Sequence, residues 1–343
     1  MGSRKRRKVH LHVEVMERRE LLAGQVSNGV LTVSSDEANP IAITVQGGNV
    51  RVNNADPDTG AVAASSITGI VINGNAQDNV INLAGVSLTD FTALITLQAS
   101  TGDGNDTIIV STAGIPAGLT VDLGAGTSDR VELTGSATNL SLVFPNPITW
   151  NVDGRAFTSR NVELPLINFA PTNLSFTLPP GSVASINDGA AANDGISRIT
   201  NVLNPNIFTE FVGPTGALTF SARPDSAATF DFAGLDAASR PASVALIGGA
   251  QDDTAIVSTA GIPENGLTIN GGAGRDTLRV IGTATRPNIR RQRGGTIVRF
   301  RNRRILIPLG DVETLERQVV VRVRLPIRRS SSSSAASSTS RGG

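Results

Sequence analysis

Residues 271–279 read Gly-Gly-Ala-Gly-Arg-Asp-Thr-Leu-Arg. This stretch matches in full the nine-residue pattern G-G-x-G-x-D-x-U-x, in which U is a large apolar residue. The glycines permit backbone conformations with positive φ and leave carbonyl oxygens uncovered, and the aspartate adds a charged oxygen. The apolar residue points into a core. The stretch therefore encodes a turn followed by a strand.

Weaker copies of this pattern recur upstream, but they are not tandem. Residues 101–109 keep every defining position except the first glycine, whereas residues 248–254 lose the third glycine. Residues 73–80 keep one glycine, and residues 123–131 carry one extra residue before the aspartate. The chain thus holds several turn-and-strand units of unequal quality.

The spacing of these units predicts the architecture. Asp78 and Asp106 are 28 residues apart, Asp106 and Asp129 are 23 apart, and Asp253 and Asp276 are again 23 apart. Nine-residue stacking is excluded for most of the chain. A spacing in the twenties indicates coils of a larger parallel β-solenoid, in which each coil buries its apolar face only against its neighbours and the Gly-Asp corners form a column.

A longer duplication divides the chain. Residues 109–116, Ile-Val-Ser-Thr-Ala-Gly-Ile-Pro, return letter for letter at 256–263, a shift of 147 residues (256 − 109). We therefore expect an all-β protein, a parallel β-solenoid or β-roll-like stack in two related halves. The expected boundaries are a basic leader at 1–24, halves at 25–165 and 166–328, and a disordered Ser-rich tail at 329–343. An array of cadherin-like β-sandwiches is the alternative fold.

Composition agrees with many turns and short strands. The 343 residues include 36 glycines and 17 prolines, and short segments such as 41–45, 107–110 and 244–247 alternate apolar with polar residues. There is no cysteine, so neither disulfides nor a thiolate metal site can form. No apolar run approaches the ~18 residues of a membrane span, so we expect no integral membrane protein.

The pattern resembles the calcium-binding repeats of RTX (hemolysin-type) secreted proteins. That resemblance implies calcium as a ligand, and it implies export. The residues that match the pattern, and so become candidate calcium ligands, are Gly272, Gly274, Asp276 and Asp253 in the second half and Gly102, Gly104, Asp106 and Asp129 in the first. Because calcium takes 6 to 8 oxygens, each site would need corners from two adjacent coils. The alternative is that glycine and aspartate serve turn geometry alone.

The N-terminal stretch carries a second resemblance. Residues 16–23, Met-Glu-Arg-Arg-Glu-Leu-Leu-Ala, resemble the LEPR-XLL motif found ahead of repetitive surface-associated or secreted bacterial proteins. Glu17, Arg18, Leu21 and Leu22 match, whereas Met16 replaces leucine and the proline is missing. The motif implies an extracellular or cell-surface location in a bacterium. Residues Arg4 to Lys8 could alternatively be a nucleic-acid-binding arm or a nuclear-import signal. Nothing downstream of them resembles a nucleic-acid-binding module.

Candidate catalytic groups are few. The only histidines, His10 and His12, lie in the leader, so the body has no histidine for a Ser-His-Asp triad, a zinc centre or a general base. Carboxylate and arginine chemistry of the polysaccharide-lyase kind would have to use Asp129 with Arg130, or Asp276 with its neighbouring arginines. We expect solvated pairs instead, and so no catalytic residue. We also expect Trp150 to pack in the core rather than to form a sugar platform.

Charge is unevenly distributed. Residues 21–274 hold 7 arginines and 22 acidic residues, a balance of −15, whereas residues 275–343 hold 16 arginines and 4 acidic residues, a balance of +12. An acidic body suits cation binding, and the alternating Arg299 and Arg301, like Arg322 and Arg324, suit an anionic partner unless they merely solvate a strand face. The sequence thus predicts a non-catalytic, calcium-stabilised structural or adhesive protein whose further partner is an anionic polysaccharide or another surface protein. A polysaccharide-binding or lyase-like protein is the alternative.

Overall fold

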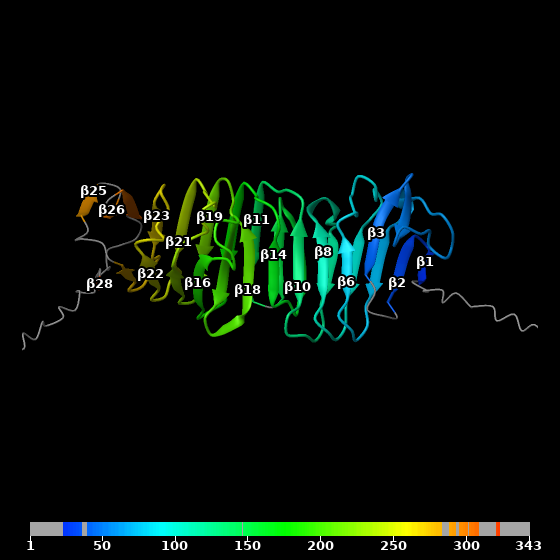
Figure 1. The fold of residues 1–343 in the computed structure, drawn as a ribbon, viewed down its shortest axis with the longest axis horizontal. Coiled ribbons are helices and arrows are strands. Elements are labelled where there is room, and N and C mark those ends of the chain that lie inside the picture. Colours follow the sequence, from blue (N-terminus) through cyan, green and yellow to red (C-terminus); the bar gives the residue numbers. More distant parts are fainter. Residues whose placement is uncertain are drawn as a thin grey trace, which may run out of the picture.

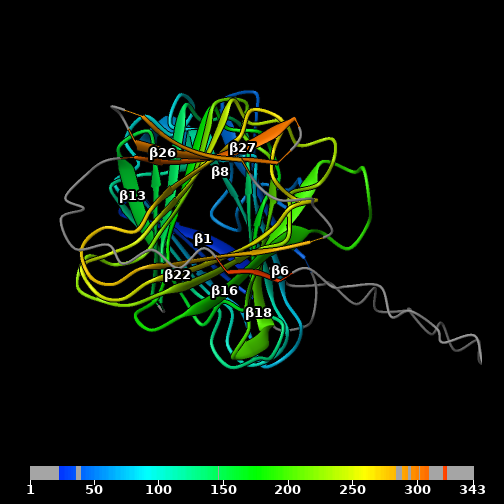
Figure 2. The same cartoon turned by 90° about the vertical axis from the view of Figure 1, so that its left-hand side faces the viewer.

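The computed structural model describes residues 23–35, 40–145, 147–282, 288–292, 295–300, 302–308 and 320–322. Within them the chain forms an elongated stack of short strands, with the N-terminal strands at one end and the C-terminal strands at the other (Figure 1). The view along the stack shows two strand layers facing each other (Figure 2). No helix in the described part of the chain is long and apolar enough to cross a membrane.

Sheet A, as we name the larger layer, has fifteen strands in the described residues. In spatial order they are β1 (Ala23–Ser27), β2 (Val30–Ser34), β5 (Gly69–Asn73), β7 (Thr96–Ser100), β9 (Gly118–Asp122), β13 (Arg155–Arg160), β12 (Ile148–Val152), β11 (Asn139–Val143), β15 (Asn173–Thr177), β19 (Ala217–Ser221), β21 (Ser243–Ile247), β23 (Leu267–Asn270), β27 (Arg303–Pro308), β26 (Gly295–Phe300) and β25 (Asn288–Gln292).

Sheet B has thirteen strands in the same described ranges. In spatial order they are β4 (Asn49–Val52), β3 (Ile41–Gln46), β6 (Val80–Leu83), β8 (Thr107–Ser111), β10 (Arg130–Thr134), β14 (Leu164–Ile167), β18 (Asn204–Val212), β17 (Ile196–Asn201), β16 (Val183–Asp188), β20 (Thr229–Phe232), β22 (Thr254–Ser258), β24 (Thr277–Ile281) and β28 (Val320–Arg322). Two single-turn 3-10 helices, Ala64–Ser66 and Thr112–Gly114, lie in connections.

Most neighbouring strands are parallel, because each coil contributes one strand to each sheet before the next coil begins. Thr107 pairs with Arg130, and Thr254 pairs with Thr277, a displacement of 23 residues in both cases (130 − 107 and 277 − 254). The all-β prediction is confirmed. The parallel pairing at this displacement is what a solenoid requires.

The core lies between the sheets. Strands such as β10 and β15 alternate buried and half-buried residues, so that every second side chain points inward. At mid-stack the core is aromatic: the Phe176 ring lies 5.5 Å from Phe220 and 5.1 Å from Phe211. Trp150 is fully buried, stacks on Phe157 and donates its Nε1–H to Ser159 Oγ at 2.8 Å. The predicted core role of Trp150 is confirmed.

Three antiparallel meanders interrupt the parallel order. The first, β11–β12–β13, lies in sheet A and closes with the turn Asp153-Gly154, whose φ values are +50° and +86°. The second, β16–β17–β18, lies in sheet B. The third, β25–β26–β27, is again in sheet A, near the C-terminal end. It follows β23 and β24 as the first follows β9 and β10, in keeping with the sequence duplication.

The sheets run without a break through the middle of the chain. β15 pairs in parallel with β11 on one side and with β19 on the other, and the expected boundary between residues 165 and 166 falls inside β14. Most of the expected leader (residues 1–22) and all of the tail at 329–343 lie outside the described residues, as do Arg301 and Arg324.

The aromatic centre should be the least replaceable part of the core. Phe176→Ala removes a ring that is fully buried among other rings, so we expect a loss of about 3–5 kcal/mol in the free energy of unfolding. Urea denaturation followed by circular dichroism measures this. Ile95→Ala is the control, because Ile95 is 63% exposed and its truncation should change the free energy by about 0.5 kcal/mol or less. Equal effects of the two changes would contradict the packing described.

Candidate functional site

The Gly-Asp elements all lie at one corner of the stack. Each connects a strand of sheet A to the next strand of sheet B: residues 101–106 lie between β7 and β8, and residues 271–276 between β23 and β24. Residues 74–79, 123–129 and 248–253 occupy the same place in their coils. The predicted column of corners is therefore present, in two groups separated by the central meanders.

Within the column, each carboxylate is bound by the backbone of the preceding coil. Asp129 Oδ1 accepts the N–H of Asp106 at 2.8 Å, and Asp106 Oδ1 accepts the N–H of Asn79 at 2.6 Å. The chain of bonds continues from the Asp129 N–H to Glu163 Oε2 at 3.0 Å. We call these residues the first corner ladder. It brings Asp106 and Asp129 together, as the sequence predicted.

A second corner ladder has the same geometry. Asp253 Oδ1 accepts the N–H of Ala228 at 2.6 Å, and Asp276 Oδ1 accepts the N–H of Asp253 at 2.9 Å. Asp253 Oδ2 also accepts the N–H of Gly249 at 2.6 Å, within its own turn. The Asp253 carboxylate therefore ties its own turn together and links it to the preceding coil, while the Asp253 backbone N–H links the turn to the next coil.

The glycines give the carboxylates room and allow the turn. A Cβ on Gly271 would lie 2.1 Å from Asp276 Oδ2, so a side chain there would expel the carboxylate. Gly272 has φ +84°, and a Cβ on it would lie 2.0 Å from the Gly249 carbonyl oxygen of the preceding coil. The other predicted glycines, Gly274, Gly102 and Gly104, also have positive φ. They are needed for turn shape and for close stacking of coils.

Two of the corner carbonyls bind along the stack. Gly102 O accepts the Ala125 N–H at 2.9 Å, and Gly249 O accepts the Ala273 N–H at 3.0 Å. Among the carboxylate oxygens of the corners, Oδ2 of Asp106, Asp129 and Asp276 is buried without a hydrogen-bond partner. These unsatisfied anionic oxygens fit a hard cation in chemical type, although calcium would need the remainder of its 6 to 8 oxygens from neighbouring corners.

Burial makes these carboxylates weak acids. Desolvation raises the pKa of Asp129 to about 6, against the lowering effect of the Asp106 N–H bond, and the charges of Glu163 and Asp106 raise it further. Burial likewise raises the pKa of Asp106, Asp253 and Asp276. Ionised carboxylates in the corner column are therefore unfavourable, because they are buried and lie close to one another. Binding of a proton or a cation would remove this free-energy cost.

A second group of acids was not found from the sequence. Oxygens of Asp188, Asp194 and Asp236 all lie within 4.8 Å of one another, and no other set of three acidic side chains in the described residues does so. We call this the acidic cluster. Asp188 ends β16, Asp194 precedes β17, and Asp236 comes from the following coil. The Asn-Asp-Gly tripeptides at 187–189 and 193–195 were a visible signal, but the arrival of Asp236 depends on the stacking of coils.

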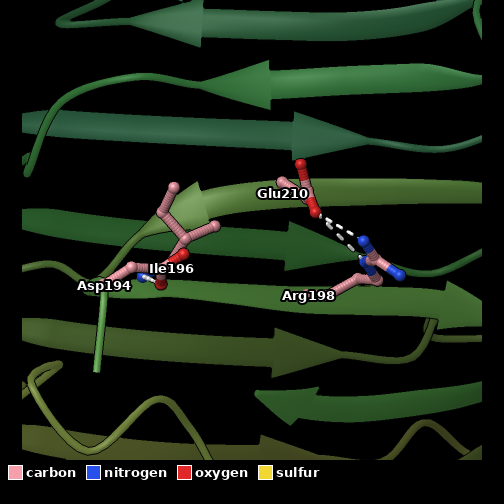
Figure 3. Close-up of polar contacts among 4 residues, drawn as sticks. All are labelled: Asp194, Ile196, Arg198 and Glu210. Atoms are coloured by element: carbon pink, nitrogen blue, oxygen red, sulfur yellow. Dashed lines mark hydrogen bonds and ion pairs between the residues drawn. The ribbon is translucent and has the colours of Figure 1, made fainter. Parts of the chain in front are cut away.

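Hydrogen bonds fix the acidic cluster. Asp236 is buried and accepts the N–H groups of Gly195 at 3.0 Å and Ala238 at 2.6 Å. Burial alone would raise the pKa of Asp236, but these donors hold it below its usual range, whereas burial and the facing Asp236 carboxylate raise the pKa of Asp188. Figure 3 shows Asp194 bound to the N–H of Ile196, with the Arg198–Glu210 pair nearby on β17 and β18.

The imagined catalytic pairs are not brought together as pairs. Asp129 points into the first corner ladder, while the guanidinium of Arg130 lies 3.4 Å from Glu132. Asp276 likewise points into the second corner ladder. Asp129 and Arg130, although adjacent in sequence, thus serve different neighbours.

No family model matches the chain, and no curated protein matches it either. Function is therefore argued from the geometry above.

The pKa of Asp129 leads to a test of pH dependence. Its folded-state pKa of about 6 exceeds the ordinary 3.8, so the folded state favours the neutral carboxyl, and its stabilising effect is lost as pH rises from ~4 through 6. Asp129→Asn keeps an oxygen for the Asp106 N–H without the charge, and Asn79 already occupies the equivalent corner position two coils earlier. We expect the variant to unfold at higher urea concentration than the wild type at about pH 8 with chelator present.

The difference between the two proteins should shrink towards zero near pH 4, where the wild-type carboxyl is neutral. Asp90→Asn, at an exposed turn, is the control and should leave the urea midpoint unchanged at both pH values. A lower midpoint for Asp129→Asn at pH 8 would show that the negative charge itself stabilises the corner.

Proposed function

We propose that this chain is a non-catalytic structural or adhesive β-solenoid of the bacterial cell surface or exterior. The observation that carries the proposal is the unbroken pair of sheets whose coils are tied by the two corner ladders. Such a stack is a quasi-one-dimensional rod, because each coil contacts only its neighbours, and it presents long lateral faces to partners. Spacing and presentation of a surface are the tasks this shape suits.

Two sequence features support the location. The leader resembles the LEPR-XLL motif, and the Gly-Asp corners resemble the repeats of exported RTX proteins. The absence of cysteine in the sequence agrees with a protein that relies on hydrogen-bonded corners rather than on disulfides. The alternative is a β-helix protein that binds or cleaves envelope polysaccharide. It shares the fold and the location, and it differs in that the polysaccharide is its specific ligand or its substrate.

The proposal is tested on intact cells of the producing organism. Antibodies against the folded stack should label unpermeabilised cells or be absorbed by the culture medium, because a structural or adhesive rod acts outside. Purified full-length chain should leave pectate and alginate uncleaved when calcium is present. Labelling only after permeabilisation would contradict the location. Release of unsaturated oligosaccharides, lost in Arg130→Ala or Arg275→Ala, would establish the enzymatic alternative.

Calcium is the proposed stabilising ligand. The support is the RTX-like pattern, the buried and unpartnered Oδ2 atoms of Asp129 and Asp276, and the acidic balance of residues 21–274. A bound cation would relieve the charge cost that raises the pKa of these acids. The acidic cluster is a second place in the described chain where oxygen ligands gather, and the test below separates the two.

Calcium at ten times its dissociation constant should stabilise the folded chain by about 1.4 kcal/mol if it binds only that form. We therefore expect the melting temperature to rise by a few degrees over that in chelator. Asp276→Ala should remove the gain if the second corner ladder binds the ion, whereas Asp236→Asn should remove it if the acidic cluster does. Asp90→Ala, the surface control, should keep the gain. An unchanged wild-type melting curve would mean that the corners are purely structural.

A further inference from the structure

The outer face of the third meander carries an arginine patch, which we define as Arg290 on β25, Arg299 on β26 and Arg304 on β27. All three side chains are exposed. Pairing fixes their positions: Arg299 lies directly opposite Arg304, and Arg290 lies opposite Ile297, which is on the same side of β26 as Arg299 but is itself buried. The patch therefore spans three adjacent strands on one surface.

Arg299 and Arg304 form a like-charged cross-strand pair. Side chains directly opposite each other on antiparallel strands have Cβ atoms about 4.5–5.5 Å apart, and like charges at that spacing are destabilising. None of the ion pairs found in the described residues involves Arg290, Arg299 or Arg304. The repulsion between Arg299 and Arg304 therefore favours the binding of an anion at this surface.

A polar hollow adjoins the patch. Arg299 and Arg304 line it together with Asn265, Asn302, Glu264 and Arg303. The single acid among them, Glu264, is 3.4 Å from Arg240 and is about three-quarters exposed. Arg303 is held in the wall by bonds from its guanidinium to the Ala260 and Ile262 carbonyl oxygens. The hollow thus offers two free cations beside two amide side chains.

The first meander shows that the fold does not require this charge. In both meanders the residue pair one step before the closing pair of the last two strands faces outward. In the first meander that pair is Asn151 opposite Ala156, whereas in the third it is Arg299 opposite Arg304. The same backbone positions therefore carry a neutral pair in one half of the duplication and a doubly cationic pair in the other.

We propose that the arginine patch binds a carboxylate-bearing polysaccharide, a polyuronate. The planar forks of two neighbouring arginines match carboxylate groups bidentately, and a row of acids along a polymer would bridge the pair and relieve its repulsion. The amides of Asn265 and Asn302 suit sugar hydroxyls. Phe300 is the one aromatic side chain in the described parts of β25, β26 and β27, and it is buried, so the face has no platform on which a nucleic-acid base could stack.

This inference deepens the proposed adhesive function and rests on it for the source of the ligand. Binding is measured on the purified full-length chain, separately from surface labelling, glycan cleavage and calcium-dependent melting. If the arginine patch does not bind the polyuronate, the proposed structural role still stands. If the chain cleaves the glycan or lies inside the cell, the proposed function is wrong, however tightly the patch binds the polyuronate.

The test uses biolayer interferometry on immobilised polygalacturonate in chelator, so that calcium does not bridge polymer and protein. R299N/R304A introduces the side chains found at the equivalent positions of the first meander, Asn151 and Ala156, and should weaken binding at least tenfold. R155A/R160A removes the same charge from exposed positions on β13 and should weaken it less than twofold. N151R/A156R builds a second arginine pair in the first meander and should strengthen binding. Affinity for the wild type should fall as salt rises.

Three outcomes would overturn the inference. One is equal loss in R299N/R304A and R155A/R160A, which would mean attraction by net charge alone. Another is unchanged binding in R299N/R304A, with the variant's melting temperature matching the wild type. The third is binding to single-stranded DNA of matched charge as tight as to polygalacturonate, which would replace the polysaccharide with a general polyanion. If R299N/R304A fails to fold, N151R/A156R decides alone: no gain in affinity then counts against the patch geometry.

Discussion

The stack depends on the bond from a backbone N–H to the corner carboxylate of the next coil. Within the sheets, parallel strands satisfy one another, but at each corner the chain changes direction and its polar groups leave the regular pairing. Asp129 receives the N–H of Asp106, and Asp276 receives that of Asp253, so the turn of one coil is completed by the side chain of the next. Buried N–H groups without such partners would cost about 1–3 kcal/mol each. The corner acids therefore set both the position and the spacing of successive coils.

The central meanders keep the two sheets in step. β11–β12–β13 adds two strands to sheet A, which alone would leave sheet A longer by about 10 Å at ~4.8 Å per strand. β16–β17–β18 follows immediately and adds two strands to sheet B. After both insertions β19 and β20 resume the simple coil beside β15 and β16. The aromatic cluster of Phe176, Phe211 and Phe220 lies here, on β15, β18 and β19.

Sequence reasoning recovered the elements whose cause is local. The Gly-Asp spacing predicted the coil length, and alternation predicted strands such as β8 and β21, because both depend on residues a few positions apart. The Asp153-Gly154 turn has the same kind of local cause. The acidic cluster was not: Asp236 meets Asp188 and Asp194 only because one coil lies on another, and that register is set by the meanders, whose long-range pairing leaves no short pattern.

The corner illustrates the limit at the level of chemistry. The sequence predicts that a turn with glycine carbonyls and an aspartate faces a cation. The corner aspartates do lie next to one another, Asp106 beside Asp129 and Asp253 beside Asp276. What the pattern could not specify is the direction of the carbonyls, since Gly102 and Gly249 give theirs to the N–H groups of the next coil. That choice depends on how the next coil lies against the turn, which no residue within the nine-residue pattern specifies. Calcium binding thus depends on the corner oxygens that accept no bond of this kind.

The duplicated meanders show which positions can change. Inward-facing Trp150 and Phe157 of the first, like Val298 and Ile305 of the third, are buried and apolar, because removal of volume there would cost core packing. The outward pairs, Asn151 with Ala156 and Arg299 with Arg304, contact solvent, so their chemistry can differ without altering the fold. A repeated scaffold can in this way keep a neutral pair in one meander and carry a charged pair at the same positions of another. The positive balance begins within the second half: residues 21–274 carry −15, whereas residues 275–343, which include the third meander, carry +12.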